Sequence, residues 1–176
     1  KIEDGDVQAV NISRSENKMR LSIGDSKSPN NIYVYDFPTK NLKKLTNTLN
    51  PEMDGNDLVS AEIVRFKSFD GLDIPAIYYK PRQAGVSNKV PALVWVHGGP
   101  GGQSRTGYFS LIQYLVNHGY AILAVNNRGS SGYGKAFIEA DNYKNRDKSV
   151  KDGIWAAKFL IDQGYTDKKM IAAWGG

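Results

Sequence analysis

The sequence predicts an α/β fold that is preceded by a set of antiparallel strands. Three observations support this prediction. Residues 1 to about 60 contain short runs in which apolar and polar residues alternate, which is typical of strands with one buried face. Residues 61–176 contain continuous apolar runs that alternate with helical spacing, which is typical of a parallel sheet covered on both faces. A polar, turn-rich connector at residues 50–57 separates the two styles.

The first part of the chain is predicted to contain three or four strands. Three alternating runs are visible, at residues 7–13, 19–23 and 31–36. So few strands cannot bury two faces by themselves. We therefore interpret residues 1–50 as one blade or edge of a larger β-domain, with residues 51–61 as a linker. A complete, independent small sheet is the alternative.

The second part begins with a predicted β-hairpin. Residues 62–69 and 72–79 are apolar-rich runs, and Asp70-Gly71 between them is a strong hairpin signal. Pro75 lies inside the second run and cannot donate a hydrogen bond to a neighbouring strand. We therefore expect this strand to lie at a sheet edge or to contain a bulge.

Strands and helices then alternate. Continuous apolar runs predict buried strands at residues 90–96, 120–125 and 170–174. Apolar residues at helical spacing predict helices at 108–116 and 149–163. We interpret Ser149 and Asp152 as a capping box of the second helix. Its predicted apolar face contains Val150, Ile154, Ala157, Phe159, Leu160 and Ile161.

The composition excludes several classes of function. The formal net charge is +5, but the lysines are interleaved with acids and form no basic stripe, so we expect no nucleic-acid partner. No apolar run approaches the roughly 20 residues that span a bilayer, so we expect no membrane partner. With no cysteine, the chain can form neither a disulfide nor a cysteine nucleophile, which fits a reducing compartment such as the cytoplasm.

A glycine-rich loop, which reads HGGPGGQ from His97 to Gln103, follows the predicted strand 90–96. So many glycines indicate backbone torsions or close approaches that side chains would prevent. One interpretation is an oxyanion hole, in which a backbone N–H at Gly98 or Gly99 faces the oxygen that becomes negative during acyl transfer. A flexible turn is the alternative. A phosphate-binding loop would need a glycine pattern that the sequence lacks.

A second informative loop, residues 126–134 (NNRGSSGYG), follows the predicted strand 120–125. Ser130 and Ser131 do not lie at a strand-to-helix elbow, so we reject both as nucleophiles. We expect Arg128 to be a structural clamp whose guanidinium binds carbonyl groups or a carboxylate. Tyr133 either lines the site or packs against it.

The predicted strand 170–174 is followed by Gly175 and Gly176. A buried strand that ends in glycine is how the nucleophile elbow G-x-S-x-G begins. Gly175 would be the first glycine of the elbow and Gly176 its variable position. We therefore expect a nucleophilic serine directly after Gly176. An ordinary turn is the alternative.

Together these stretches resemble the prolyl oligopeptidase family of serine peptidases, and within it the acylaminoacyl-peptidase-like branch. The resemblance rests on HGGPGG after a VWV strand, on NNRGSSGYGKAF, and on DGIWAAKFLIDQGYTDKKMIAAWGG. Residues 32–46 are similar to a closing blade of a β-propeller. The likeness is weak before Pro51 and strong from Pro91 onward.

The resemblance implies a fold and a mechanism. Residues 62–176 would be the front part of an α/β-hydrolase domain, and residues 1–50 the antiparallel strands of a β-propeller's last blade. Gly99, with Gly98 beside it, would offer an oxyanion N–H, and neither a metal nor an organic cofactor would be needed. The substrate would be a short peptide or an acyl-aminoacyl peptide. The remainder of the propeller and of the catalytic domain would be the structural partner, and homo-oligomerisation stays open.

Neither histidine is expected to be the catalytic base. In the α/β-hydrolase order the nucleophile comes first, then the acid, then the histidine. His97 and His118 both precede the expected elbow. His118, beside Gly119, is predicted to cap the C-terminus of a helix. The chain would then lack the nucleophile, the acid and the base, and we expect these 176 residues alone to be inactive.

Three alternatives share part of this pattern. Proline iminopeptidases also use HGGPGG, but a DQRG-type sequence usually follows their next strand, where this chain has Asn-Asn-Arg-Gly at residues 126–129. Lipases and esterases with HGG loops are a second alternative, and a non-catalytic relative that acts as a binding domain is a third. The residue after Gly176 separates an enzyme from a non-catalytic relative. Substrate profiling separates a peptidase from an esterase.

Overall fold

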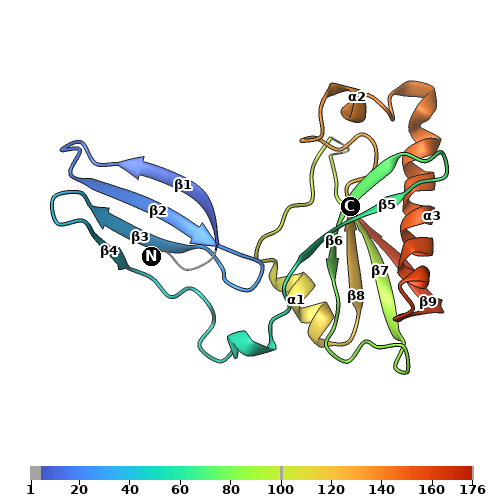
Figure 1. Cartoon of the computed structure of the whole chain (residues 1–176), viewed down its shortest axis with the longest axis horizontal. Coiled ribbons are helices and arrows are strands. Elements are labelled where there is room, and N and C mark those ends of the chain that lie inside the picture. The colour runs from blue at the N-terminus through green and yellow to red at the C-terminus, as the bar shows by residue number, and fades with distance from the viewer. Residues whose placement is uncertain (1–4, 100, 176) are drawn as a thin grey trace. The chain divides into compact units, whose positions relative to one another are not determined.

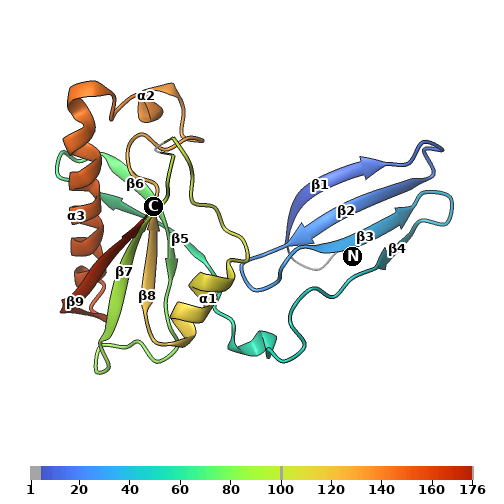
Figure 2. The same cartoon turned by 180° about the vertical axis from the view of Figure 1, so that it is seen from behind.

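The computed structural model of the chain describes residues 5–99 and 101–175, which form two compact units (Figures 1 and 2). The first unit contains Lys1–Ser60 and Thr106–Gln113, and the second contains Ala61–Arg105 and Tyr114–Gly176. In the described part of the chain, no helix is long and apolar enough to cross a membrane.

The first unit contains a four-stranded antiparallel sheet whose strands lie in chain order (Figure 1). The strands are β1 (Asp6–Ile12), β2 (Lys18–Gly24), β3 (Asn31–Asp36) and β4 (Asn41–Lys44), and a short 3-10 helix, η1 (Gly55–Asp57), follows them. Alternation along the strands places Leu21, Ile23 and Tyr33 in one small buried cluster. The three predicted strands are confirmed. The assignment of residues 1–50 to a propeller blade and of 51–61 to a linker stays a prediction.

The second unit contains a five-stranded mixed sheet in the order β5-β6-β8-β7-β9. Its strands are β5 (Glu62–Lys67), β6 (Asp73–Tyr79), β7 (Val90–Val96), β8 (Ala121–Val125) and β9 (Thr166–Gly175). Strand β7 pairs in parallel with both β8 and β9, whereas β6 pairs antiparallel with β5 and β8. The predicted fold class is confirmed, because an antiparallel sheet precedes an α/β sheet.

Helix α3 (Arg146–Asp162) packs along one face of this mixed sheet (Figures 1 and 2). Ala156 and Leu160 of α3 are fully buried against Val94 and Leu123 in the main core cluster. Every residue of β8 is buried, so both faces of this strand are covered, as its continuous apolar run predicts. The other helical segments are α1 (Ser110–Asn117), which confirms the predicted helix 108–116, α2 (Lys135–Ile138) and the 3-10 helix η2 (Tyr143–Asn145).

The predicted start of helix 149–163 is wrong, and its predicted apolar face is right only in part, because Ala157, Phe159 and Leu160 pack in or against the core whereas the other predicted positions are exposed. The helix begins at Arg146, and Ser149 is already inside it, where its hydroxyl donates to the Arg146 carbonyl at 2.8 Å. Asp152 caps nothing, because it is buried and binds other groups. The buried stripe of α3 is Asp152, Ala156 and Leu160, whereas Val150 and Ile154 are exposed.

The hairpin prediction is right in its pairing and wrong in two details. Lys67 pairs with Asp73, so the turn is longer than Asp70-Gly71 alone, although Gly71 adopts a positive φ of 83° within it. Pro75 does not lie on an edge strand, because β6 is paired on both sides. The β6–β8 pairing begins at Ala76, so the missing N–H of Pro75 faces the end of that ladder and interrupts no bond within it.

Candidate active site

Three segments converge where the parallel strands of the mixed sheet end. Val96, the last residue of β7, pairs with Val125 at the end of β8 and with Gly175 at the end of β9. A Cβ on Gly175 would lie 3.0 Å from the Val96 carbonyl oxygen, so the two strands approach closely. Gly176 lies outside the described residues. The loops after β7 and β8 and the end of β9 therefore meet at one edge of the sheet, where α/β sheets bind ligands.

The loop after β7, residues 97–105, is folded tightly on itself. Gly99 has a φ of 121°, a conformation that side chains disfavour, and a Cβ there would lie 2.9 Å from the Gly102 nitrogen. A Cβ on Gly102 would lie 2.5 Å from the Gly98 carbonyl oxygen. Both clashes are with backbone atoms and cannot be relieved by rotating a side chain. Gly99 and Gly102 are therefore needed for this loop shape.

The amides of Gly98 and Gly99 are available as hydrogen-bond donors. Both residues are exposed. Among the residues that the structure describes, none accepts a hydrogen bond from either N–H. N–H groups that have no acceptor within the described residues and lie on a fixed backbone suit an anionic oxygen, because they need not reorganise when negative charge develops.

The His97 ring is engaged within the loops. Its Nε2 lies 2.8 Å from the Ser130 hydroxyl oxygen, and its Nδ1 lies 3.1 Å from the Gly98 carbonyl oxygen. Ser130 is fully buried, and its hydroxyl also donates to the Asn127 carbonyl at 2.6 Å. A buried hydroxyl in this arrangement holds the imidazole and is not accessible to a substrate.

The loop after β8, residues 126–134, holds the loop after β7 at further points. The Ser131 N–H donates to the Gly102 carbonyl at 2.9 Å. The Asn126 side chain forms two hydrogen bonds with the backbone of Ser104. With the His97–Ser130 contact, the first loop is attached to the second near its start, middle and end.

Arg128 is a buried clamp for two carboxylates. Its guanidinium forms a bidentate pair with Asp70, at 2.8 and 2.9 Å, and two bonds of 2.9 Å with Asp152. The backbone N–H of Arg128 also donates to Asp152 at 3.0 Å, and the Ser68 hydroxyl donates to the same carboxylate at 2.5 Å. The charges of Arg128 and Asp152 can be buried because every one of these contacts is charge-assisted.

The clamp shifts the ionisation of its members. The hydrogen bonds from Arg128 lower the pKa of Asp70 to about 2. The same hydrogen bonds, first with Asp70 and then with Asp152, raise the pKa of Arg128 above its ordinary value. Both carboxylates therefore stabilise the charged form of the guanidinium, which suits a structural role.

Tyr133 and His118 have simpler surroundings. The Tyr133 hydroxyl accepts a hydrogen bond from the Asn126 amide at 2.8 Å, and its ring meets Phe137 edge to face. The His118 Nδ1 lies 2.8 Å from the Tyr114 carbonyl oxygen at the end of α1, so the predicted helix cap is confirmed. His118 precedes the start of β8, whereas the three segments converge where that strand ends.

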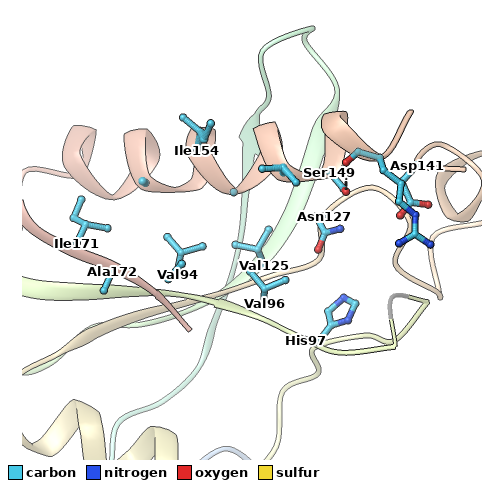
Figure 3. A pocket seen from close by; sticks show the side chains of 15 residues that line it. Val94, Val96, His97, Val125, Asn127, Asp141, Ser149, Ile154, Ile171 and Ala172 are labelled. Carbon is cyan, nitrogen blue, oxygen red and sulfur yellow. Dashed lines mark hydrogen bonds between the residues drawn. The ribbon is translucent and has the colours of Figure 1, made fainter. Parts of the chain in front are cut away.

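A cavity of about 660 Å³ adjoins the site between α3 and the sheet (Figure 3). Its walls are apolar and include Val94 and Val96 of β7, Ile154 of α3 and Ile171 of β9. At one end of it, Figure 3 shows polar side chains that include His97, Asn127, Asp141 and Ser149. The Asn127 side-chain oxygen is buried and has no hydrogen-bond partner among the described residues.

Sequence reasoning missed Asn126 and the partners of Arg128. The sequence predicts only a turn residue at Asp70 and a cap at Asp152, because the two carboxylates lie 58 and 24 positions from Arg128 along the chain. One signal was available for Asp152, because it shares a helix face with Ala156 and Leu160 at a spacing of four. A carboxylate on a buried stripe requires a cationic partner.

The chain matches the model of the prolyl oligopeptidase family over residues 107–176. It is 33% identical to dipeptidyl aminopeptidase BIII of Pseudoxanthomonas mexicana, over 99% of this chain and 26% of that protein. It is 32% identical to the acylamino-acid-releasing enzyme of Sus scrofa, over 61% of this chain and 15% of that enzyme.

A solved structure extends the comparison to the fold. The crystal structure of puromycin hydrolase superimposes with a TM-score of 0.81 at 22% identity, covering 96% of this chain and 26% of that one. At this identity the likeness shows a shared fold. The chain spans about a quarter of the length of relatives that match it from end to end.

Proposed function

Because this chain belongs to the prolyl oligopeptidase family, as its motifs predict, we propose that it is part of a serine peptidase. The complete protein hydrolyses short peptides or acyl-aminoacyl peptides through an acyl-enzyme. In this proposal the chain supplies the oxyanion hole and the start of the nucleophile elbow. The acid and the base lie elsewhere in the complete protein.

One observation carries the proposal. Gly175 pairs with Val96, directly beside the loop that presents the Gly98 and Gly99 amides. A serine two residues after Gly175 would follow the end of β9 at the same sheet edge. The nucleophile and the oxyanion donors would then approach the same carbonyl group, as acyl transfer requires.

The reaction proceeds by acyl transfer to water. The serine hydroxyl oxygen attacks the peptide carbonyl carbon, and a histidine takes the hydroxyl proton. The carbonyl oxygen becomes negative and accepts hydrogen bonds from the Gly99 N–H and one further amide, at about 3 kcal/mol per donor. The amine then leaves with the proton, and water releases the acyl group by the reverse sequence. His97 holds the loop and takes no part in proton transfer.

Residues 1–50 belong, in this proposal, to the last blade of a β-propeller. Their four-stranded antiparallel sheet has only a small buried cluster. Such a sheet suits one blade among several, because neighbouring blades would supply the rest of its core. A propeller beside the catalytic domain would restrict access to short peptides.

Substrate profiling of the complete protein tests the proposal. We expect turnover of dipeptidyl and acetyl-aminoacyl p-nitroanilides, and loss of turnover when the serine after Gly176 is replaced by alanine. Turnover of short-chain p-nitrophenyl esters alone would identify an esterase. Cleavage only after an N-terminal proline would identify an iminopeptidase. No turnover of any substrate by the folded protein would identify a binding domain.

A further inference from the structure

Asn126, the first residue after β8, is 1% exposed and makes hydrogen bonds in three directions. Its backbone N–H donates to the Pro75 carbonyl in β6 at 2.9 Å. Its side-chain oxygen accepts from the Ser104 N–H at 2.7 Å, and its side-chain nitrogen donates to the Ser104 carbonyl at 3.0 Å. The same nitrogen donates to the Tyr133 hydroxyl oxygen at 2.8 Å. Both ends of the side-chain amide are therefore used.

The two hydrogen bonds between the Asn126 side chain and the Ser104 backbone attach the loop to the end of β8, as main-chain hydrogen bonds would attach a neighbouring strand. Ser104 lies at the downstream end of the loop 97–105, whose upstream end continues directly from β7. Asn126 is itself fixed by the sheet through Pro75. A glycine-rich loop has little conformational preference of its own, so its attachments set its shape.

The chemistry of this attachment is specific to a primary amide. One planar group must accept from an N–H and donate to a carbonyl on the same residue, Ser104. An aspartate has the same shape but no donor at neutral pH, and it would place a carboxylate oxygen against the Ser104 carbonyl oxygen. A buried group that loses its partner is costly, so the loop would move away from an aspartate.

We propose that Asn126 is a positioning residue for acyl transfer, which holds the downstream end of loop 97–105 and thereby keeps the Gly98 and Gly99 amides aimed at the oxyanion. The inference rests on the proposed function, because it requires the oxyanion hole to lie in this loop. Asn126 touches no substrate and acts through the loop. A misplacement of about 1 Å can cost 10² in rate, so loosening this attachment lowers kcat by roughly 10- to 100-fold.

The test measures kcat and KM of Asn126→Asp in the complete protein, with a p-nitroanilide substrate that the unmodified enzyme hydrolyses. We expect kcat to fall by roughly 10- to 100-fold and KM to stay within about threefold of the unmodified value. The reason is that the loop amides bind the oxyanion, which forms only in the transition state. Asn142→Asp is the matched control. It makes the same chemical change at an exposed position that forms no side-chain cap bond, and its kinetics should be unchanged.

A second variant removes the hydrogen-bond donor that the loop supplies to Asn126. Ser104→Pro removes the N–H that donates to Asn126, at a partly buried position outside the core cluster. It should show the same fall in kcat, and it decides the question if Asn126→Asp does not fold. Normal kcat in folded Asn126→Asp and folded Ser104→Pro would overturn the inference. So would a raised KM with unchanged kcat.

A double-mutant cycle separates positioning from general structural damage. In a Gly99→Ala background the oxyanion donor is already displaced, so adding Asn126→Asp should lower kcat by less than about threefold more. Full multiplication of the two losses would show that Asn126 acts elsewhere and would overturn the inference. Unchanged turnover of Gly99→Ala alone would contradict the proposed oxyanion hole itself. A lowered kcat of Gly99→Ala together with a normal kcat of Asn126→Asp would contradict only the positioning role of Asn126.

Discussion

Gly99 and Gly102 fix the path of the loop after β7 at the scale of single residues. A Cβ at either position would meet backbone atoms of the same loop, and Gly99 also has a φ of 121°. The glycines are therefore required by close approach and by torsion, and they do more than provide flexibility. Gly101 differs, because a Cβ there would meet nothing closer than 3.9 Å.

Gly99→Val in the complete protein should lower kcat by roughly 10² while the protein stays folded, because the substitution would displace the proposed oxyanion donor. Gly101→Ala, in the same loop, should retain near-normal kcat and is the matched control. Steady-state kinetics with one peptide substrate measures both, and circular dichroism checks folding. Near-normal turnover of folded Gly99→Val would mean that the oxyanion amide lies elsewhere.

At the scale of elements, the Arg128 clamp joins three segments that are distant in sequence. Asp70 lies in the β5–β6 turn, Arg128 follows β8, and Asp152 lies in α3. Arg128 and Asp152 are 3% and 0% exposed, whereas Asp70 is 38% exposed. The two ion pairs should therefore differ in their effect on stability, because solvent screens only the exposed one.

Asp152→Ala should lower the free energy of unfolding of this domain by about 3 kcal/mol, because it leaves buried hydrogen-bond donors of Arg128 without a partner. Asp70→Asn should lower it by less than about 1 kcal/mol at pH 7. Glu139→Gln, at an exposed pair with a separation of 3.8 Å, is the control and should change nothing measurable. Urea unfolding of the complete protein, followed by tryptophan fluorescence, measures all three. Equal effects of the two aspartates would contradict the clamp.

The same clamp predicts a pH dependence with a definite sign. Arg128 depresses the pKa of Asp70 to about 2 in the folded state, below the ordinary value of 3.8. Its stabilisation is therefore fully present above about pH 4 and is lost as the pH falls toward 2. In Asp70→Asn, the free energy of unfolding should not show this loss between about pH 4 and pH 2, because the variant has no carboxylate at position 70 to protonate. An unchanged difference in stability between the two proteins from pH 5 to pH 2 would contradict the assignment.

The strands were more predictable from sequence than the contacts between segments. Strand β7 was predicted at its observed bounds because a buried parallel strand is a continuous apolar run with polar ends. Strand β9 begins four residues before the predicted 170, because its first residues are mostly polar and carry no such signal. The tight conformation of the loop after β7 could be predicted, because repeated glycine indicates positive φ angles or close backbone approaches. The hydrogen-bond partners of Arg128 and Asn126 could not be predicted, because they lie on segments that are distant in sequence and meet only in the folded structure.

In the proposed enzyme, the chain as a whole contributes one part of the catalytic arrangement. It spans about a quarter of the length of its end-to-end relatives, and two loops and a strand end converge within its second unit. In the proposed enzyme the nucleophile follows that strand end, and the acid and base come from further along the polypeptide. The position of the proposed nucleophile can therefore be tested without knowing the preferred substrate.

Reaction of the complete protein with a fluorophosphonate, followed by mass spectrometry of its peptides, locates the nucleophilic residue. The serine oxygen displaces fluoride from phosphorus only where a nearby base and oxyanion donors activate it. We predict one adduct, on the serine directly after Gly176, with Ser130 and Ser131 unmodified. An adduct on Ser130, on Ser131 or at a distant residue, or no adduct on the folded protein, would contradict the assignment of this site.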